Sequence, residues 1–199
     1  MLFHFLSAVF GSNWLEQSAS VIALAGIVLT VMRRSFSWIL DIISSLMYGA
    51  VFYGAGFYSD SLLQLLFIAM SIYGWLSWTS IRAGKPVLSI RKIKQQELII
   101  TLAVIFILTL GGGFFFSHFV RGAAYPYADS LCTAISVAAT WLTARKIIQN
   151  WYLWIVADLI YIWLFCLKHL YPTAILYSVL VVLAITGLIS WKKIETATL

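Results

Sequence analysis

The amino-acid sequence predicts an all-α membrane protein of seven transmembrane helices. Composition is the first observation, since 62% of the 199 residues are hydrophobic and only 10% are charged, with a mean hydropathy of +0.96. A soluble domain carries about 25% charged residues. The second observation is the presence of seven long apolar stretches, and the third is a one-sided distribution of basic residues. We expect one transmembrane domain over 1–199, with no room for a separate soluble domain of ordinary size.

Seven stretches are long and apolar enough for membrane spans, which need about 20 residues each. Six of them are bounded by charged or turn residues, and the seventh, 129–145, contains Ser and Thr of the kind that helix bundles tolerate. Residues 1–12 lack a Lys or Arg before their apolar run, so we expect an interfacial or membrane-dipping segment rather than a signal peptide. The expected spans are 16–32, 38–54, 60–79, 97–118, 129–145, 151–167 and 173–191.

The basic residues test this count of spans. Seven spans place 11 of the 13 Lys and Arg residues on one side and only Arg121 and Lys168 on the other. By the positive-inside rule, the N-terminus lies outside and the C-terminus in the cytoplasm. The net charge of +6 therefore reflects topology, and nucleic-acid binding is not expected. The 11 residues are Arg33, Arg34, Arg82, Lys85, Arg91, Lys92, Lys94, Arg145, Lys146, Lys192 and Lys193.

An internal repeat organises the chain. Trp78 and Trp191 lie 113 residues apart, and so do Gly74 and Gly187. Residues 16–78 align with 129–191 without a gap over 63 positions, with 16 identities. Shared Trp, Tyr and Gly in register are not explained by apolar composition, so we interpret the two segments as repeats.

The repeats predict a 3+1+3 architecture. Each copy holds three spans, and the span at 97–118 restores the orientation of the second copy, so the two repeats run parallel. The sugar transporters of the SWEET type have this arrangement, in which two bundles flank a central axis. The architecture therefore favours a transporter, by analogy of fold.

Asp158 stands in the otherwise apolar stretch Asn150–Trp163. It lies about 10 Å along a helix from Trp151, well inside a hydrocarbon core about 30 Å thick. A carboxylate there costs about 2.5–3.5 kcal/mol, so it must face the bundle interior. Trp154 shares its helix face, and indole rings attract cations. We expect a site for an organic cation at Asp158. The alternative roles of Asp158 are an interhelical hydrogen bond and a proton relay. Trp151 is equally placed to anchor the helix at the membrane interface.

Positions at which the repeats differ in polarity indicate where an asymmetric substrate binds. Asp41 alternatively pairs with Arg33 or Arg34, and Gln64 alternatively bonds a neighbouring helix. Ser136, Thr140 and Trp141 are expected to line the bundle or to make helix contacts. The candidate substrate-binding residues are Trp154, Asp158, Gln64, Trp151, Tyr161, Tyr177, Trp141, Ser45 and Asp41.

Other functional classes lack their residues in this sequence. A retinal protein needs a Lys in its last span, and 173–191 has none. No H-E-x-x-H or G-x-S-x-G pattern occurs, and His4, His118 and His169 lie at span ends. We therefore expect neither an enzyme nor a metal site nor a cofactor, and we assign no catalytic residue. A seven-helix receptor of another kind is a distant alternative.

Two segments resemble the PnuC-type vitamin transporters. They are "LLQLLFIAMSIYGWLSW" (Leu62–Trp78) and "SVAATWLTARKIIQNWYLWIVADLIY" (Ser136–Tyr161). The family pattern is an L-Q element leading to Y-G-W-x-x-W, then A-R-K and N-W-x-x-W, and the resemblance covers about residues 14–192. It implies seven spans, a bacterial inner-membrane location, often a homotrimer, and facilitated diffusion of an unphosphorylated vitamin that a cytoplasmic kinase then traps.

The resemblance also carries over the family's binding motif, which falls on Gln64, Trp151, Trp154 and the position of Asp158. Nicotinamide riboside carriers typically have Asn where this chain has Asp158 and a Gly-like residue where it has Asp41. Both nicotinamide riboside and thiamine are cations, and the acids tilt the expectation slightly toward thiamine. Neutral riboflavin ranks third, and proton coupling through Asp158 is the alternative to facilitated diffusion.

Overall fold

The structure is a computed structural model, and it describes residues 14–54, 58–79, 89–120, 125–167 and 171–197. The expectation for residues 1–12 falls outside the described residues, as do His4 and His169. Within them the chain forms seven α-helices: α2 (Trp14–Val31), α3 (Ser37–Gly54), α4 (Tyr58–Trp78), α5 (Gln95–Phe119), α6 (Pro126–Ala144), α7 (Asn150–Leu167) and α8 (Tyr171–Ala197).

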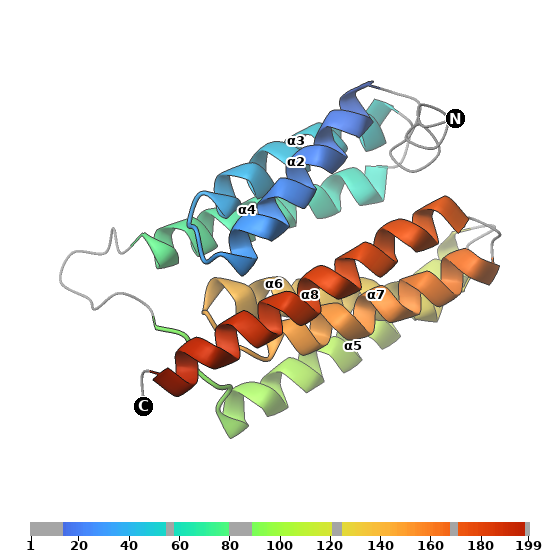
Figure 1. Cartoon of the computed structure of the whole chain (residues 1–199). Helices are drawn as coiled ribbons and strands as arrows, with labels where there is room; N and C mark the ends of the chain where they lie inside the picture. Colours follow the sequence, from blue (N-terminus) through green and yellow to red (C-terminus); the bar gives the residue numbers. More distant parts are fainter. Residues whose placement is uncertain (1–13, 55–57, 80–88, 121–124, 168–170, 198–199) are drawn as a thin grey trace.

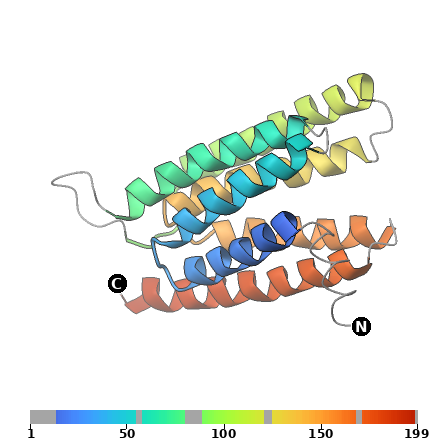
Figure 2. The same cartoon turned by 90° about the horizontal axis from the view of Figure 1, so that it is seen from above.

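The helices form two bundles (Figure 1). The first bundle is α2, α3 and α4, with α3 in contact with both others; the second is α6, α7 and α8, with α7 in contact with both others. The bundles meet where α4 contacts α6 and where α2 contacts α8, and Figure 2 shows α2 alongside α8. Helix α5 packs on α6 alone among the described helices.

The all-α fold with seven helices is confirmed, and the predicted spans correspond one to one with α2–α8. The largest difference in length is in α8, which continues beyond 191 to Ala197. Lys192 and Lys193 mark the point where side chains become polar, but no Gly or Pro follows them to end the helix.

Five of the seven helices are long and apolar enough to cross a membrane: α2, α3, α5, α7 and residues 173–196 of α8. The apolar part of α4 is shorter, from Leu63 to Trp78. Helix α6 is more polar, and it is enclosed by α4, α5 and α7. The hydroxyls of Thr140 and Thr143 donate to the backbone of the same helix, Thr143 Oγ1 to the Ala139 carbonyl at 2.8 Å. Polar residues are thus tolerated in α6 because the helix is buried in the protein.

A tryptophan packs on a glycine in each bundle. A Cβ atom at Gly74 would lie 2.6 Å from the ring of Trp38, and one at Gly187 would lie 2.6 Å from the ring of Trp151. Each glycine therefore allows an indole to lie directly on the backbone of the neighbouring helix. Trp151 is only 2% exposed, so the alternative that it anchors the membrane interface is wrong.

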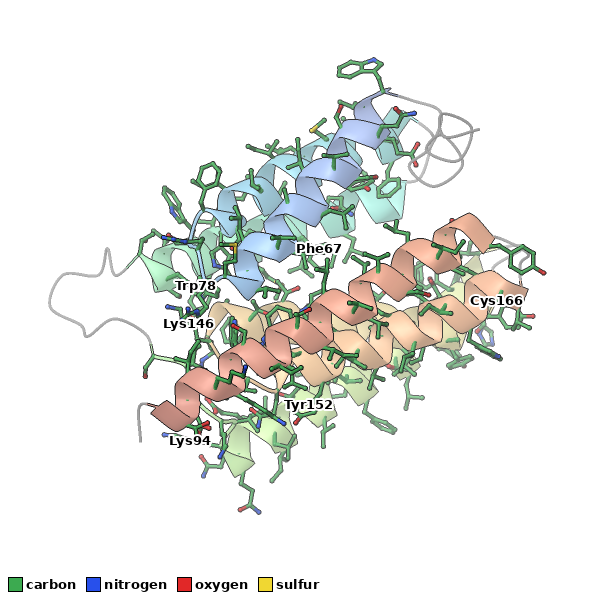
Figure 3. All side chains as sticks on the ribbon, in the orientation of Figure 1. Phe67, Trp78, Lys94, Lys146, Tyr152 and Cys166 are labelled. Carbon is green, nitrogen blue, oxygen red and sulfur yellow. The ribbon has the colours of Figure 1, made fainter. Side chains whose placement is uncertain are left out.

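Four indoles form a row that joins the bundles, which we call the tryptophan cluster: Trp38, Trp78, Trp191 and Trp151. Successive ring centroids are 5.5, 5.9 and 5.4 Å apart. The Trp78 indole Nε1 also donates a hydrogen bond to the Thr143 carbonyl of the second bundle at 3.2 Å. The cluster thus holds the two bundles together at one end of the molecule, where Figure 3 labels Trp78 and Lys146.

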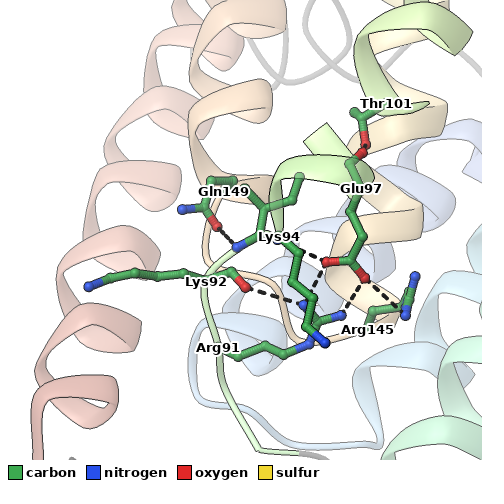
Figure 4. Close-up of polar contacts among 8 residues, drawn as sticks. Arg91, Lys92, Lys94, Glu97, Thr101, Arg145 and Gln149 are labelled. Carbon is green, nitrogen blue, oxygen red and sulfur yellow. Dashed lines mark hydrogen bonds and ion pairs between the residues drawn. The ribbon is translucent and has the colours of Figure 1, made fainter. Parts of the chain in front are cut away.

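Residues 89–94, which we call the basic strap, lie on the second bundle at this same end (Figure 4). The Arg91 backbone N–H donates to the Lys146 carbonyl at 3.1 Å, and the Ile148 N–H donates to the Arg91 carbonyl at 3.0 Å. Glu97, in the first turn of α5, pairs with Arg91 at 2.7 Å and with Arg145 at 3.0 Å. The strap therefore fixes the start of α5 to the loop between α6 and α7. We refer to this end of the molecule as the basic end.

Candidate functional site

A cavity of about 490 Å³ lies between the two bundles. Sites for small organic molecules have volumes of about 300–1,000 Å³. Trp38 and Trp151 of the tryptophan cluster lie at its basic end, and Phe67, labelled in Figure 3, projects toward it from α4. Its polar and aromatic lining residues are Thr30, Trp38, Asp41, Ser44, Ser45, Phe52, Gln64, Phe67, Ser71, Asp129, Thr133, Ser136, Thr140, Thr143, Trp151, Trp154, Asp158, Tyr161 and Tyr177.

The structure brings most of the candidate residues to this one cavity. Helices α3 and α4 of the first bundle contribute Asp41, Ser45 and Gln64 to its wall. The second bundle contributes the remaining candidates but one, and these are Trp151, Trp154, Asp158, Tyr161 and Tyr177.

Trp141 does not reach the cavity. Its side chain is 42% exposed and stacks on Tyr73 at a centroid distance of 5.0 Å. Thr140 and Ser136 do line the cavity. One step along a helix turns the side chain by about 100°, so Trp141 points away from the direction taken by Thr140.

Carboxylates dominate the charge of the cavity. Asp41, Asp129 and Asp158 line it, and its described lining residues include no Lys, Arg or His. Asp158 is 5% exposed, and the described residues provide neither Asp158 nor Asp41 with an ion pair. The alternative ion pair of Asp41 with Arg33 or Arg34 is therefore not formed. The Asp41 carboxylate instead lies against Gly26 of α2, where an added Cβ atom would be 2.6 Å from Asp41 Oδ1. A buried carboxylate without a protein cation is suited to a cationic ligand.

Aromatic rings surround the buried acid of the second bundle. Tyr161 and Tyr177 lie 4.9 Å apart between centroids, and both line the cavity together with Trp154. Trp154 precedes Asp158 by one turn of α7, so the two side chains share a helix face. Ring faces and a carboxylate together attract a flat organic cation by charge and by cation–π contact.

Asp129 is a lining residue that the sequence did not reveal as part of the site. It lies in the first turn of α6, where an acidic residue is ordinarily explained by the helix dipole. In the alignment of the repeats it is opposite Glu16, so it did not stand out as a position where the copies differ. The signal in the sequence was the presence of two acids in the second bundle, because Asp129 near the start of α6 adds negative charge to the cavity that the buried Asp158 also lines.

Comparison with known proteins places the chain in a family. A family model described as nicotinamide mononucleotide transporter matches residues 13–193, which is most of the chain. The chain belongs to this family. Members of this transporter family are carriers rather than enzymes, and this member is a multi-pass protein of the bacterial inner membrane, as the PnuC-type resemblance implied.

The chain has several characterised relatives. One is the nicotinamide riboside transporter PnuC of Escherichia coli (strain K12), which is 26% identical over 90% of this chain and 85% of that protein. The riboflavin/roseoflavin transporter RibM of Streptomyces davaonensis is 22% identical over 74% of this chain and 70% of its own length. A crystal structure of the vitamin B3 transporter PnuC matches with a TM-score of 0.72 at 21% identity, covering 98% of this chain and 90% of that one. The PnuC-type recognition is confirmed, and the structural match shows the same fold.

Proposed function

We propose that this protein takes up an unphosphorylated, cationic B-type vitamin, either nicotinamide riboside or thiamine. The observation that carries the proposal is the cavity between the bundles, whose described lining has three carboxylates, several aromatic rings and no basic residue. Such a lining attracts a cation and repels the anionic phosphate of a phosphorylated vitamin. The relatives named nicotinamide riboside transporter support the same class of substrate.

We propose specific roles for the residues that line this cavity. Asp158 supplies the negative charge, and Trp154 supplies a ring face for the cation. Gln64 offers an amide to a substrate hydroxyl or amide group. Tyr161 and Tyr177 form the wall around the bound ring.

The remaining lining candidates hold the substrate from its other sides. Trp151 closes the cavity toward the basic end, where it packs on Gly187. Ser45 and Asp41 are presented by α3, so they contact the substrate from the first bundle. A substrate bridging the two bundles in this way responds to any change in their separation.

The proposed architecture is two parallel repeats, 16–78 and 129–191, with the helix at 97–118 between them. Its support is the pattern of helix contacts, in which the first helix of each bundle meets the third helix of the other, as in α2 with α8 and α6 with α4. This is the pattern of a twofold axis along the membrane normal. With the basic end in the cytoplasm, the N-terminus lies outside and the C-terminus inside.

Transport in this scheme is facilitated diffusion by rocking of the two bundles. In the present arrangement the tryptophan cluster blocks the path from the cavity toward the basic end. Separation of Trp78 from Trp191 and from the Thr143 carbonyl opens that path. Phosphorylation in the cytoplasm then removes the vitamin from the equilibrium, because the acidic cavity rejects the phosphorylated product.

A binding screen with purified protein tests the proposal. Thiamine and nicotinamide riboside are expected to bind, and neutral riboflavin to bind at least tenfold more weakly. Asp158→Asn and Trp154→Ala are each expected to weaken binding of the cations by about tenfold to a hundredfold, because each removes an attraction of about 1.5–3 kcal/mol. Trp141→Ala is the matched control, since Trp141 lies outside the cavity. Unchanged binding of every vitamin in both cavity variants contradicts the proposed site.

Two observations support alternative transport functions. The likeness to RibM keeps riboflavin as a candidate substrate, which the same screen decides. The buried acid Asp158 is also suited to carry a proton, and uptake into liposomes decides that case. Accumulation above equilibrium, driven by a pH gradient alone, contradicts facilitated diffusion.

The homotrimer that the family resemblance implies remains a prediction. Mass measurement of the protein extracted in a mild detergent tests it, with three copies as the expected result.

A further inference from the structure

A second cavity, of about 660 Å³, opens at the basic end. Arg33 and Arg34 reach it from the loop between α2 and α3, and Lys146 reaches it from the loop between α6 and α7. Ser89 of the strap and Ser190 of α8 supply hydroxyl groups to its wall. The two cavities share no lining residue. This second cavity therefore lies between the same two bundles but has the opposite charge.

No described acidic residue neutralises this charge. Of the acids at the basic end, Glu97 is engaged by Arg91 and Arg145, and Glu195 is paired with Lys92 at 3.3 Å. Three further acids, Asp41, Asp129 and Asp158, line the first cavity, between the two bundles. Glu16 and Asp60 lie in the first turns of α2 and α4, at the end of the first bundle away from the basic end. The described ion pairs thus leave Arg33, Arg34 and Lys146 unmatched.

Arg33 and Lys146 approach each other from different bundles. They occupy equivalent positions 113 residues apart, and both adopt left-handed backbone conformations, with φ of 61° and 51°. Burial lowers the pKa of the Lys146 ammonium group, and the nearby Arg33 guanidinium lowers it further. Lys146 Nζ also lies 4.9 Å from the centroid of the Trp78 ring, which belongs to the tryptophan cluster. Two like charges thus repel each other across the contact that closes the basic end.

We propose that a phosphate-bearing anion binds in this second cavity between Arg33 and Lys146 and holds the two bundles together at the basic end. Phosphate oxygens accept charge-assisted hydrogen bonds from guanidinium and ammonium groups. A bound phosphate converts the repulsion between the bundles into two attractions, and Arg34 provides a third. A lipid phosphodiester and a free phosphate ester share this chemistry.

The first arm of the test uses inorganic phosphate and purified protein in a neutral detergent. Thermal unfolding is followed by intrinsic tryptophan fluorescence while phosphate is exchanged for chloride at constant ionic strength. The wild type is expected to show a saturable rise in Tm with phosphate. Arg33→Asn and Lys146→Asn are each expected to weaken the apparent phosphate affinity about tenfold or more. Asn is chosen because it tolerates the left-handed backbone at both positions.

Two further variants make the comparison specific. Lys146→Arg retains the charge and is expected to retain the response to phosphate. Lys193→Gln removes an exposed charge of α8 outside the cavity and is expected to behave as the wild type.

The second arm uses nanodiscs of phosphatidylcholine with and without phosphatidylglycerol. If the ligand is a lipid headgroup, phosphatidylglycerol raises the Tm of the wild type more than that of Arg33→Asn or Lys146→Asn, while free phosphate has no effect in detergent. If the ligand is a free phosphate ester, the detergent arm alone responds. Absence of a response in both arms, or an equal response in Lys193→Gln and the cavity variants, overturns the proposal. These readouts do not depend on transport, so they stand apart from the test of the vitamin site.

Discussion

The first bundle and the second bundle are built alike at the tryptophan cluster and differ around the cavity between them. Trp38 meets Trp78 edge to face at 5.5 Å and 89°, and Trp151 meets Trp191 at 5.4 Å and 90°. The tyrosine–phenylalanine stacks also match, at 5.8 Å in both Tyr48–Phe52 and Tyr161–Phe165.

One set of differences between the bundles lies on the wall of the cavity between them. At equivalent positions, α3 carries Asp41 and Ser45, whereas α7 carries Trp154 and Asp158, and all four line the cavity. Shared residues therefore build the packing that both bundles need, and unshared residues make the cavity asymmetric. The packing that the bundles share can therefore be changed separately from the cavity wall on which they differ, and variants of either kind test this separation.

The largest expected effect concerns the shared glycines. Gly74→Ala and Gly187→Ala each place a methyl group 2.6 Å from an indole ring, so each is expected to destabilise its bundle by up to about 3 kcal/mol. Gly111→Ala in α5 is the control, because no atom lies within 4 Å of the added Cβ. Fluorescence-detected thermal unfolding in detergent measures the effect. If only one of the two variants is less stable than the wild type, the tryptophan–glycine contacts of the two bundles are not equivalent.

The next effect concerns the unshared acid. Asp158→Ser is expected to weaken binding of the cationic vitamin by about 2 kcal/mol, or roughly thirtyfold. Adding Ser45→Asp restores the charge at the equivalent position of the first bundle. Because the residue one turn before position 45 is Asp41 rather than a tryptophan, we expect only partial recovery. Calorimetric titration measures the affinity of both variants for the vitamin. Full recovery of the affinity in the double variant shows that the charge is sufficient without the neighbouring indole.

A smaller effect separates two tryptophans that are equivalent by position. Trp78 Nε1 donates to the Thr143 carbonyl, whereas Trp191 Nε1 is buried without a partner among the described residues. Trp78→Phe therefore loses a hydrogen bond of about 1 kcal/mol that Trp191→Phe does not. We expect the lower Tm for Trp78→Phe. Equal values mean that this hydrogen bond contributes nothing to the contact between the bundles.

The smallest effect concerns the basic strap, which among the described residues is hydrogen-bonded to the second bundle at Lys146 and Ile148. Arg145, which pairs with Glu97, has Met32 as its counterpart in the first bundle. Glu97→Gln is expected to cost about 1 kcal/mol or less, because the pairs are partly exposed. The difference in Tm from the wild type is expected to shrink at high salt. A difference that is unaffected by salt points to packing rather than to the ion pairs.

The helices were predictable because apolar runs end at charged residues, and these also mark most helix ends. The position of Asp158 and Trp154 on the wall of one cavity was predictable, because a carboxylate inside a membrane must face the interior of the bundle. Orientation about a helix axis was harder. The face of α7 followed from its pattern, but α6 has small and polar residues on several sides, so Trp141 was not distinguishable from Thr140. The burial of Trp151 depends on Gly187, a contact between helices that no local pattern shows.

The tryptophan cluster has an optical consequence. Four indoles in a row, each within 6 Å of the next, exchange excitation energy and couple their electronic transitions. Only the Trp78–Trp191 contact in this row crosses between the bundles. If the bundles part at the basic end, as the proposed transport requires, that coupling breaks while the two pairs within the bundles persist. The near-ultraviolet circular dichroism of the unlabelled protein is thus a built-in reporter of the position of its two halves.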